Sequence, residues 1–371
     1  MNSPTSTKSV IRKILSSTRE KAKVIADGSA SQPSSPATLE PQNGHLHPMQ
    51  DPSVIAFVQS TINERYVYKQ FKQLSRRQHE RELSRSDDRW AIQAGRYRTD
   101  VNRYTDVIPY DSTRVILRSN CEGHNAQNDD YINASYVYTP KQSRRYVATQ
   151  GPLDNTIHQF WTMVWDHVAP TSSSATSTII MLTQLTEGGS EKCAQYWPKR
   201  IQSELEIPCR DTNPPRSLVV RLVDQQEMAD SDCTVNTIEL FLRDSNGHAT
   251  EHRQIKHLLY NGWQDMSVPS SPGKLLNYFQ LFHEYHTSEA PPVVHCTAGI
   301  GRTGVFIALD YLFTSLPHMT SEEILSDPVF ETVDELRNWR TQMVCRVSQL
   351  EFIYTLFREM VLADEGPGHE G

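Results

Sequence analysis

Apolar side chains recur at helical and strand spacings over most of the chain. Residues 155–168 place them on one face of a predicted helix, and a β-rich apolar run follows at 177–184. In 234–244 the apolar residues alternate, and Asn246-Gly247 then supplies a tight-turn signal before a second strand-like segment, 252–260. These patterns predict a helix followed by a buried strand, and further along a long β-hairpin.

Helical spacing also returns in several other parts of the chain. The predicted helices cover 54–85, 272–286, the residues after Thr303, 333–339 and 349–362. We expect the first, more charged helix to pack on the domain that follows. The last one could in principle bind a partner, but core packing is the favoured interpretation. The order of elements predicts an α/β fold, in which a highly twisted mixed β-sheet carries helices on both faces.

A polar segment precedes the regular elements. Residues 27–53 are rich in Ser, Pro, Gly, Asn and Gln, and they offer too few apolar groups to offset the entropy lost on ordering. A single core stops growing near about 250 to 300 residues, so a chain of 371 residues accommodates one large domain plus extra sequence. The predicted division is a disordered tail over 1–53, one domain over 54–363, and a flexible C-terminal tail over 364–371.

Composition excludes several classes of protein. The net charge of −7 argues against a general nucleic-acid binder, because affinity for a phosphate backbone depends on Lys and Arg. No apolar run approaches the roughly 20 residues that cross a bilayer, so we expect a soluble protein without membrane attachment. Six cysteines stand singly, which indicates thiols in a reducing compartment. We therefore expect a cytoplasmic protein, with nuclear access left open.

The first 15 residues are basic but do not resemble a secretory signal. They contain Lys8, Arg12 and Lys13, and they lack a long apolar core. Three interpretations remain open: a mitochondrial presequence, a basic segment that docks a kinase, and a solvated charged tail, which is favoured.

The segment with the clearest chemistry is 291–312, which predicts a strand, a tight loop and a helix. A loop that opens a helix aims several backbone N–H groups and the positive end of the helix dipole at one point, which suits a dianion. Gly299 and Gly301 remove Cβ atoms where the backbone must curl closely around a phosphate. Arg302 can then offer a two-pronged, permanently charged donor to two phosphate oxygens.

The same field favours an ionised cysteine. We expect the pKa of Cys296 to fall well below the free value of about 8.5, which makes this residue a nucleophile at neutral pH. Thr303 is placed to donate its hydroxyl to the sulfur, and His295 is expected to orient the loop. The phosphate would be held by the residues between the nucleophile and the arginine: Thr297, Ala298, Gly299, Ile300 and Gly301. Two alternatives are an inert cysteine beside a glycine-rich turn and an anion-binding loop without catalysis.

The sequence HCTAGIGRTG, 295–304, resembles the signature of the cysteine-dependent protein tyrosine phosphatases, in particular the non-receptor, phosphotyrosine-specific catalytic domains. Further blocks resemble the family in the family's order, and together they run from about residue 60 to 362: NRYTDVIPYDSTRV (102–115), DYINASYV (130–137), YVATQGPL (146–153), EGGSEKCAQYWP (187–198) and WQDMSVP (263–269). The resemblance implies the family's fold, with the signature loop between a central strand and a helix.

The resemblance also implies roles for residues outside the loop. Tyr104 matches the aromatic residue that makes the pocket deep enough for phosphotyrosine and too deep for phosphoserine. Asp106 matches the acid that holds the backbone amides of the substrate. Lys192 and Glu187 match positions that support the closed loop and anchor the catalytic arginine. Asp265 matches the general acid that protonates the leaving tyrosyl oxygen.

The sequence departs from the family's pattern at two places. Gln264 and Met266 flank the predicted acid where a proline and an aromatic residue are usual, next to Trp263 as the anchor of that loop. In 343–354, Gln349 matches one of two glutamines near the phosphate, but Cys345 stands in place of the other. That glutamine normally positions the hydrolytic water, so we hypothesise that Gln349 assumes its role and that the second chemical step is slow.

The leading interpretation is a tyrosine phosphatase that acts through a phosphocysteine on Cys296. It requires no metal or cofactor, because Arg302 and the loop amides stabilise the transferred phosphoryl group. The alternative is a phosphotyrosine-binding pseudophosphatase with weak turnover. Dual-specificity and phosphoinositide phosphatases are nearer competitors, against which Tyr104 and the absence of lysine in 297–301 argue. The expected partners are phosphotyrosine-containing proteins, with kinases left open, and we expect a monomer.

Overall fold

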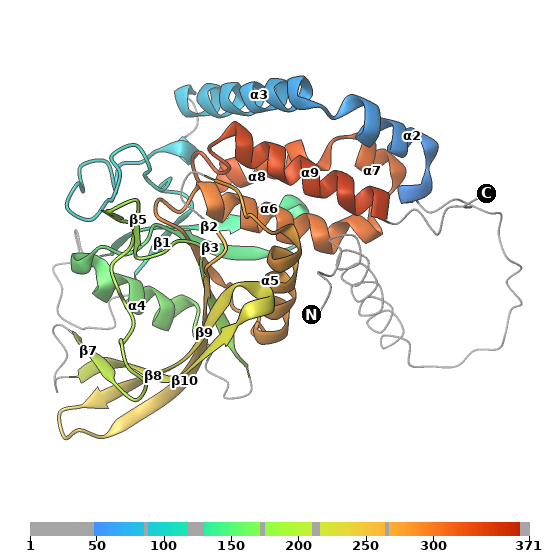
Figure 1. Ribbon diagram of the computed structural model, residues 1–371. Coiled ribbons are helices and arrows are strands. Elements are labelled where there is room, and N and C mark those ends of the chain that lie inside the picture. The colour runs from blue at the N-terminus through green and yellow to red at the C-terminus, as the bar shows by residue number, and fades with distance from the viewer. Residues whose placement is uncertain are drawn as a thin grey trace, which may run out of the picture.

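The computed structural model describes residues 48–84, 88–117, 130–170, 175–209, 216–263 and 267–363 (Figure 1). Most of the predicted N-terminal tail and the whole predicted C-terminal tail lie outside these residues. The sequence assigned 48–53 to the tail, whereas here Met49 is fully buried in the main core and α2 (Pro52–Ala56) begins within the segment. The carboxylate of Asp51 caps this helix by accepting from the N–H of Ser53 at 2.9 Å.

A nine-stranded sheet forms the centre of the described fold. In spatial order its strands are β1 (Arg114–Ile116), β2 (Tyr131–Tyr138), β3 (Arg145–Thr149), β11 (Val293–His295), β4 (Ser177–Met181), β10 (Ala249–Tyr260), β9 (Cys233–Asp244), β8 (Arg216–Met228) and β7 (Glu204–Cys209). Strand β11 pairs in parallel with β3 and β4, and β10 pairs in parallel with β4. The other pairs are antiparallel, so the sheet is mixed. A separate two-stranded sheet joins β5 (Thr186–Glu187) to β6 (Ser190–Glu191).

Helices cover both faces of this sheet (Figure 1). Besides α2 they are α3 (Glu64–Leu83), α4 (Ile157–His167), α5 (Pro272–Tyr285), α6 (Gly301–Ser315), α7 (Ser321–Leu325), α8 (Pro328–Trp339) and α9 (Val347–Ala363). Successive strand residues face opposite sides. Val293 packs in the core on the α4 side, and Val294 packs in the core that contains α5, α6, α8 and α9. The predicted fold class is confirmed.

The local elements that had the clearest sequence patterns form as predicted. Helix α4 leads to the fully buried strand β4, and β9 pairs with β10 in a long antiparallel hairpin. At the hairpin turn Gly247 adopts φ 84°, and the Asp244 carboxylate accepts from the N–H groups of Asn246 and His248 at 2.9 and 2.8 Å. The Asn-Gly signal therefore marks the turn correctly.

The predicted helix over 54–85 is interrupted. After α2 comes a π-helical turn, Phe57–Thr61, and Ile62 is then extended, with ψ 97°. Helix α3 starts afresh because the side chain of Asn63 accepts from the N–H of Tyr66 at 3.0 Å, which caps its first turn. The expected packing on the domain is present, since the Tyr66 hydroxyl donates to Asp327 at 2.7 Å.

The structure bears on two expectations from composition, the state of the cysteines and the lack of a membrane-spanning segment. Cys193, Cys233, Cys296 and Cys345 are free thiols, and Cys121 lies outside the described residues. None of the helices in the described ranges combines the length and apolar character needed to cross a bilayer.

Candidate active site

The predicted phosphate-binding loop begins where the central strand ends. Strand β11 stops at His295, and residues 296–300 lead directly into α6. Because β11 lies between β3 and β4, the loop emerges at the carboxyl edge of parallel strands, where α/β proteins commonly bind ligands. Cys296 is 5% exposed at the start of this loop.

The carbonyl groups of the loop point away from its centre. Thr297 O accepts from the N–H of Gly151 at 2.9 Å. Ile300 O accepts from two N–H groups, those of Gly304 and Val344, both at 3.0 Å. Neighbouring segments therefore hold the outer side of the loop at both of its ends.

A buried arginine holds the middle of the loop. Arg340 is fully buried and donates from Nε to Gly299 O at 2.8 Å and from Nη2 to Ala298 O at 3.1 Å. The same Nη2 also donates to the side-chain oxygen of Asn133 at 2.7 Å. Burial lowers the pKa of Arg340 to about 10, so the side chain remains charged at neutral pH. This residue ties the loop to β2.

These contacts fix the direction of the loop's amides. In a trans peptide the C=O and the following N–H point to opposite sides, so the outward carbonyls of 297–300 turn the N–H groups of 298–301 inward. In the part of the chain that the structure describes, no backbone carbonyl accepts from the N–H groups of Ala298, Gly299 or Ile300. Together with the N-terminus of α6, these inward amides form a nest for an anion.

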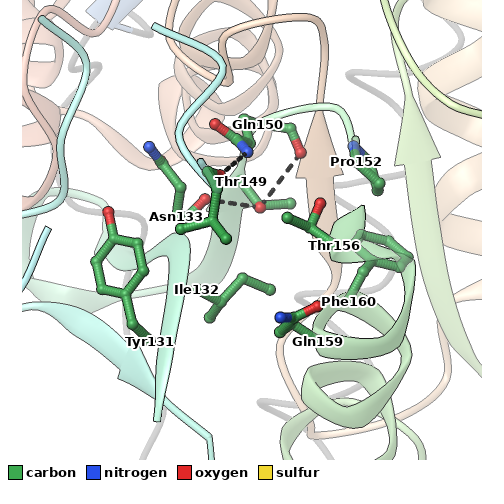
Figure 2. A pocket seen from close by; sticks show the side chains of 10 residues that line it. Tyr131, Ile132, Asn133, Thr149, Gln150, Pro152, Thr156, Gln159 and Phe160 are labelled. Atoms are coloured by element: carbon green, nitrogen blue, oxygen red, sulfur yellow. Dashed lines mark hydrogen bonds between the residues drawn. The ribbon is translucent and has the colours of Figure 1, made fainter. Parts of the chain in front are cut away.

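Gly299 is required by the close approach of the loop to β3. Its φ is 71°, and an added Cβ would lie 2.1 Å from the carbonyl oxygen of Thr149. Figure 2 shows Thr149 and Gln150 beside Asn133, and the Thr149 hydroxyl donates to Asn133 O at 2.8 Å. No other residue type could keep both this φ and this contact.

Arg302 is held in a two-bond ion pair. Its Nη1 and Nη2 donate to the two carboxylate oxygens of Glu187 at 2.8 and 2.7 Å, and Nη1 also donates to Leu182 O at 2.9 Å. Thr183 and the N–H of Gln184 donate to the same carboxylate, each at 2.9 Å. Burial alone would raise the pKa of Glu187, but these hydrogen bonds and the charge of Arg302 lower it overall. The carboxylate therefore stays ionised and orients the guanidinium.

The predicted nucleophile has the expected hydroxyl beside it. Thr303 is fully buried in the first turn of α6, and its Oγ1 donates to Cys296 Sγ at 3.4 Å. The hydroxyl of Thr303 is therefore hydrogen-bonded to the sulfur, as the sequence predicted.

His295 lies at one end of a chain of buried hydrogen bonds. Its Nδ1 is 3.2 Å from Cys296 O, which can only accept, so Nδ1 carries the proton and Nε2 accepts from the Tyr196 hydroxyl at 2.7 Å. The Tyr196 oxygen in turn accepts from His257 Nε2 at 2.8 Å, and His257 Nδ1 accepts from Asn236 at 2.9 Å. Burial lowers the pKa of His295 to about 4 and that of His257 to about 3. Both rings are neutral, and His295 orients the loop rather than serving as a base.

Two predicted substrate-binding residues lie on an exposed loop next to the site. Tyr104 is 41% exposed and Asp106 is also exposed. Arg103 anchors the loop, because its N–H donates to the Gln150 side chain at 2.9 Å. The Gln342 side chain donates to Asp106 O at 3.1 Å. The loop is thus tied both to the end of β3 and to the segment before Cys345.

The side chains of Gln349 and Cys345 both lie beside Gly301, the first residue of α6. A Cβ on Gly301 would lie 2.8 Å from Gln349 Nε2 and 3.1 Å from Cys345 Sγ. The Cys345 thiol donates to Gln349 Oε1 at 3.7 Å. The glutamine predicted for the second chemical step is therefore beside the loop, and the cysteine that departs from the family's pattern is its neighbour.

Fewer contacts are described for Lys192 and for the loop of the predicted general acid. Lys192 is partly exposed, and its N–H donates to Leu185 O at 2.8 Å. Trp263 is 1% exposed, and its Nε1 donates to Ser267 O at 2.9 Å, so the two residues that flank the predicted acid loop are in contact. Asp265 itself, with Gln264 and Met266, lies outside the described residues.

The sequence did not single out several residues that hold the site together. Arg340, Tyr196, His257 and Asn133 all belong to this group. Tyr196 and Asn133 lie inside blocks that resemble the family, and Arg340 precedes one, but no spacing distinguishes a buried polar residue from an exposed one. In the described ranges, His, Cys, Asp and Glu side chains do not form a group of three that could hold a metal ion.

Comparison with known proteins agrees with this geometry. The sequence model of the protein-tyrosine phosphatase family matches residues 98–359. Receptor-type tyrosine-protein phosphatase alpha of Mus musculus is 35% identical over 262 residues, which cover 70% of this chain and 28% of that protein. Tyrosine-protein phosphatase 1 of Schizosaccharomyces pombe is 30% identical over 299 residues, 78% of this chain and 50% of that protein. The chain therefore belongs to the protein-tyrosine phosphatase family.

A solved structure shows the same fold. The catalytic domain of human protein tyrosine phosphatase non-receptor type 18 superposes with a TM-score of 0.65 at 28% identity, over 83% of this chain and 99% of that one. The resemblance carried by the signature loop is confirmed at the level of family and fold. The chain spans half or less of the length of the two curated relatives named above.

Proposed function

We propose that the chain is a phosphatase that hydrolyses phosphotyrosine in proteins through a phosphocysteine intermediate on Cys296. The observation that carries this proposal is the loop that Cys296 begins: neighbouring groups hold its carbonyls at 297–300 from outside, so the N–H groups of 298–301 turn inward. Arg302 and Thr303 complete the arrangement from the first turn of α6. A nest of this kind both binds a phosphate dianion and favours an ionised sulfur.

In the first step the Cys296 sulfur attacks phosphorus and the tyrosyl oxygen leaves. The inward amides of the loop and the guanidinium of Arg302 stabilise the charge on the equatorial oxygens. Asp265 donates a proton to the leaving oxygen. In the second step water attacks phosphorus, Gln349 orients that water, and Thr303 stabilises the departing thiolate.

Specificity for phosphotyrosine is proposed to come from the rim. Tyr104 would form the wall that makes the pocket deep, Asp106 would hold the substrate backbone, and Lys192 would support the closed site. That the substrates are phosphotyrosine-containing proteins is supported by a solved structure of the non-receptor type 18 phosphatase, which concerns the fingerprint of that enzyme on distinct HER2 tyrosine phosphorylation sites. We further propose that this protein acts on phosphotyrosine-containing proteins in the cytoplasm, as a monomer.

Hydrolysis of p-nitrophenyl phosphate tests the proposal. We expect turnover by the wild type and none above background in Cys296→Ser, whereas Cys233→Ser, which removes a buried thiol at the start of β9, should retain turnover. A wild type that binds a phosphotyrosine peptide without turnover would instead support a pseudophosphatase. The pseudophosphatase is retained as the second candidate because Gln264 and Cys345 depart from the family's pattern.

Paired peptides test the specificity. The wild type should hydrolyse a phosphotyrosine peptide at least about 100-fold faster than the matched phosphothreonine peptide, because the shorter side chain does not reach the bottom of a deep pocket. Comparable rates would contradict the role proposed for Tyr104.

A further inference from the structure

Helix α3 lies on the outer side of α8 and α9 and packs on the domain with one face (Figure 1). Val67 and Leu74 are buried in the main core. Arg77 and Arg81 donate to the carboxylate of Asp334, on α8, at 2.8 and 2.6 Å. These contacts fix the rotation of the helix about its own axis, so its opposite face is turned away from the domain.

A line of cations occupies this outward face. Its members are exposed and stand four, three and four residues apart: Arg65, Lys69, Lys72 and Arg76. At about 100° per residue these positions fall within about 80° of the helix circumference, and the four charges form one narrow row, the basic stripe. In the part of the chain that the structure describes, Arg65, Lys69 and Lys72 form no ion pair. Arg76 lies 3.7 Å from Glu80, but the two side chains are 69% and 65% exposed, so solvent screens this pair.

The stripe concentrates positive charge on a chain that is acidic as a whole. The net charge of the chain is −7, whereas α3 has six Lys or Arg residues against three Glu. Two of these six cations pair with Asp334 on the inner face, and the other four make up the stripe. A local field of this kind attracts an anionic partner to one place on the surface.

The C-terminal half of α3 leads to the rim of the candidate active site. Gln78, two residues after Arg76, donates to the Thr341 hydroxyl at 2.9 Å and accepts from the N–H of Gln342 at 3.2 Å. The Gln342 side chain donates to Asp106 O at 3.1 Å. Two glutamines thus connect the helix to the loop that is proposed to hold the substrate backbone, and a substrate chain that leaves this loop can continue onto α3.

We propose that the basic stripe binds an acidic segment of the protein whose phosphotyrosine occupies the active site. The inference rests on the proposed function and deepens it by adding a substrate class, phosphoproteins that carry a run of Asp or Glu near the phosphotyrosine. A single exposed ion pair contributes little, so the recognition depends on several pairs that form together along the stripe.

An extended acidic segment fits the stripe better than an anionic membrane does. A helix that lies on a membrane inserts its apolar face, whereas the apolar face of α3 is buried against α8 and α9. Glu64 and Glu80 are exposed on either side of the stripe, where a flat anionic surface would meet them as well. The stripe spans 11 residues of helix, about 16 Å, which five or six extended residues match.

The experiment uses phosphotyrosine peptides joined by a short Gly-Ser linker to six glutamates or to six glutamines, placed before or after the phosphotyrosine. The wild type is compared with the double variant Lys69→Glu, Lys72→Glu. Each new glutamate lies four residues from an arginine of the stripe, so the helix is retained. The matched control is the double variant Lys199→Glu, Arg200→Glu, which makes the same change in charge at two exposed residues between β6 and β7.

Kinetics on the peptides and on p-nitrophenyl phosphate give the readout. In at least one of the two placements, the wild type and the control should show a KM at least about fivefold lower for the glutamate peptide, with equal kcat for both peptides. The preference should disappear in the α3 variant and at about 0.5 M salt, while turnover of p-nitrophenyl phosphate stays the same in all three proteins.

Equal KM values for the two peptides in the wild type, or a preference that survives in the α3 variant, would overturn the proposal. Phosphatidylserine vesicles that bind the wild type and not the α3 variant, without any peptide preference, would assign the stripe to a membrane instead. If the wild type hydrolyses neither p-nitrophenyl phosphate nor the peptides, the proposed function fails. Fluorescence anisotropy of the labelled peptides then still measures the preference for glutamate, so the two failures are distinguishable.

Discussion

Arg302 donates both of its terminal nitrogens to the Glu187 carboxylate, at 2.8 and 2.7 Å, and each of the two side chains is only 7% exposed. The pair joins the start of α6 to β5 and sets the plane of the guanidinium. Orientation matters here because a guanidinium binds a phosphate through two parallel hydrogen bonds, and a rotated plane loses one of them.

The first prediction concerns this pair. Glu187→Gln replaces one carboxylate oxygen by an NH₂ group, which cannot accept from Arg302. We expect kcat for p-nitrophenyl phosphate to fall by about 10- to 100-fold, since misplacing a group that stabilises the transition state has an effect of this size. Glu191→Gln, on the exposed strand β6, is the control and should change kcat less than about threefold. Equal effects of the two substitutions would show that the pair does not orient Arg302.

The second prediction separates backbone strain from steric conflict. Gly299 and Gly247 both have positive φ, 71° and 84°, but of these two only Gly299 would place an added Cβ against a neighbour, the carbonyl oxygen of Thr149. Gly247→Ala should cost about 1–2 kcal/mol of stability, which is the usual penalty of an L residue in the left-handed region. Gly299→Ala should cost more and should also abolish turnover, because the loop must move away from β3.

Urea unfolding and the p-nitrophenyl phosphate assay measure both effects. If Gly299→Ala were as active as Gly247→Ala, the loop could form its anion nest without close contact to Thr149, and the inward direction of the amides would be wrong.

The fold was largely predictable where a single local pattern decides the structure. The Asn246-Gly247 turn, the buried strand 177–181 and the apolar stripe of α9 needed no knowledge of the rest of the chain. The break after α2 was missed because Asn63 interrupts the helix by a side-chain hydrogen bond, while the apolar spacing continues on both sides. Strands β7 and β8 carry mixed burial and many charged residues, so their periodicity is weak.

The candidate site could be proposed from the sequence for a different reason. Cys296 and Arg302 lie in one short segment of sequence, so their spacing along the chain already limits how far apart they can be in the structure. Arg340 and His257 support the loop from distant parts of the chain, and their roles depend on burial, which no spacing reveals. The site therefore divides into a local part that the sequence predicts and a supporting part that only the tertiary structure identifies.

The third prediction follows from the two buried histidines. Burial lowers the pKa of His295 to about 4 and that of His257 to about 3, whereas an unfolded histidine has a value of about 6.5. Between these values the unfolded state binds more protons than the folded state, so stability falls as the pH falls below about 6.5. Each histidine should contribute about 2 kcal/mol of lost stability between pH 7 and pH 5.

Urea unfolding of His257→Gln at the two pH values checks this. The variant should be less stable at pH 7, because the hydrogen bonds that link Asn236, residue 257 and Tyr196 are altered. Its loss of stability on going from pH 7 to pH 5 should be about 2 kcal/mol smaller than that of the wild type. His248→Gln is the control, since that side chain is 77% exposed. A loss in His257→Gln as large as in the wild type would contradict the neutral, buried state of the ring.

The fourth prediction tests the proposed general acid through the leaving group. Asp265→Asn cannot donate the proton, so kcat for a phosphotyrosine peptide should fall by about 10²- to 10⁴-fold. p-Nitrophenolate leaves more easily without protonation, so the loss with p-nitrophenyl phosphate should be clearly smaller. The ratio of the two losses is the measurement, and each substrate is a control for the other. Equal losses would remove Asp265 from the first step.

The fifth prediction concerns the second chemical step. A thiol is a weak donor and a weak acceptor, whereas a glutamine amide is strong in both roles, so Cys345 cannot hold a water as the family's usual residue would. Gln349 is the amide that remains beside Gly301, with its Nε2 2.8 Å from the Cβ position of that glycine. We therefore expect rapid phosphorylation of Cys296 and slow hydrolysis of the intermediate.

Stopped-flow measurement of p-nitrophenol release separates these steps, because the first step releases the phenol and the second regenerates the thiolate. The wild type should show a burst followed by a slower steady state. Cys345→Gln should leave the burst rate nearly unchanged and raise the steady-state rate by about tenfold, since a second amide can orient the attacking water. Identical steady-state rates in the two proteins would mean that Gln349 alone positions the water as well as the pair does, and that the cysteine at 345 has no cost for turnover.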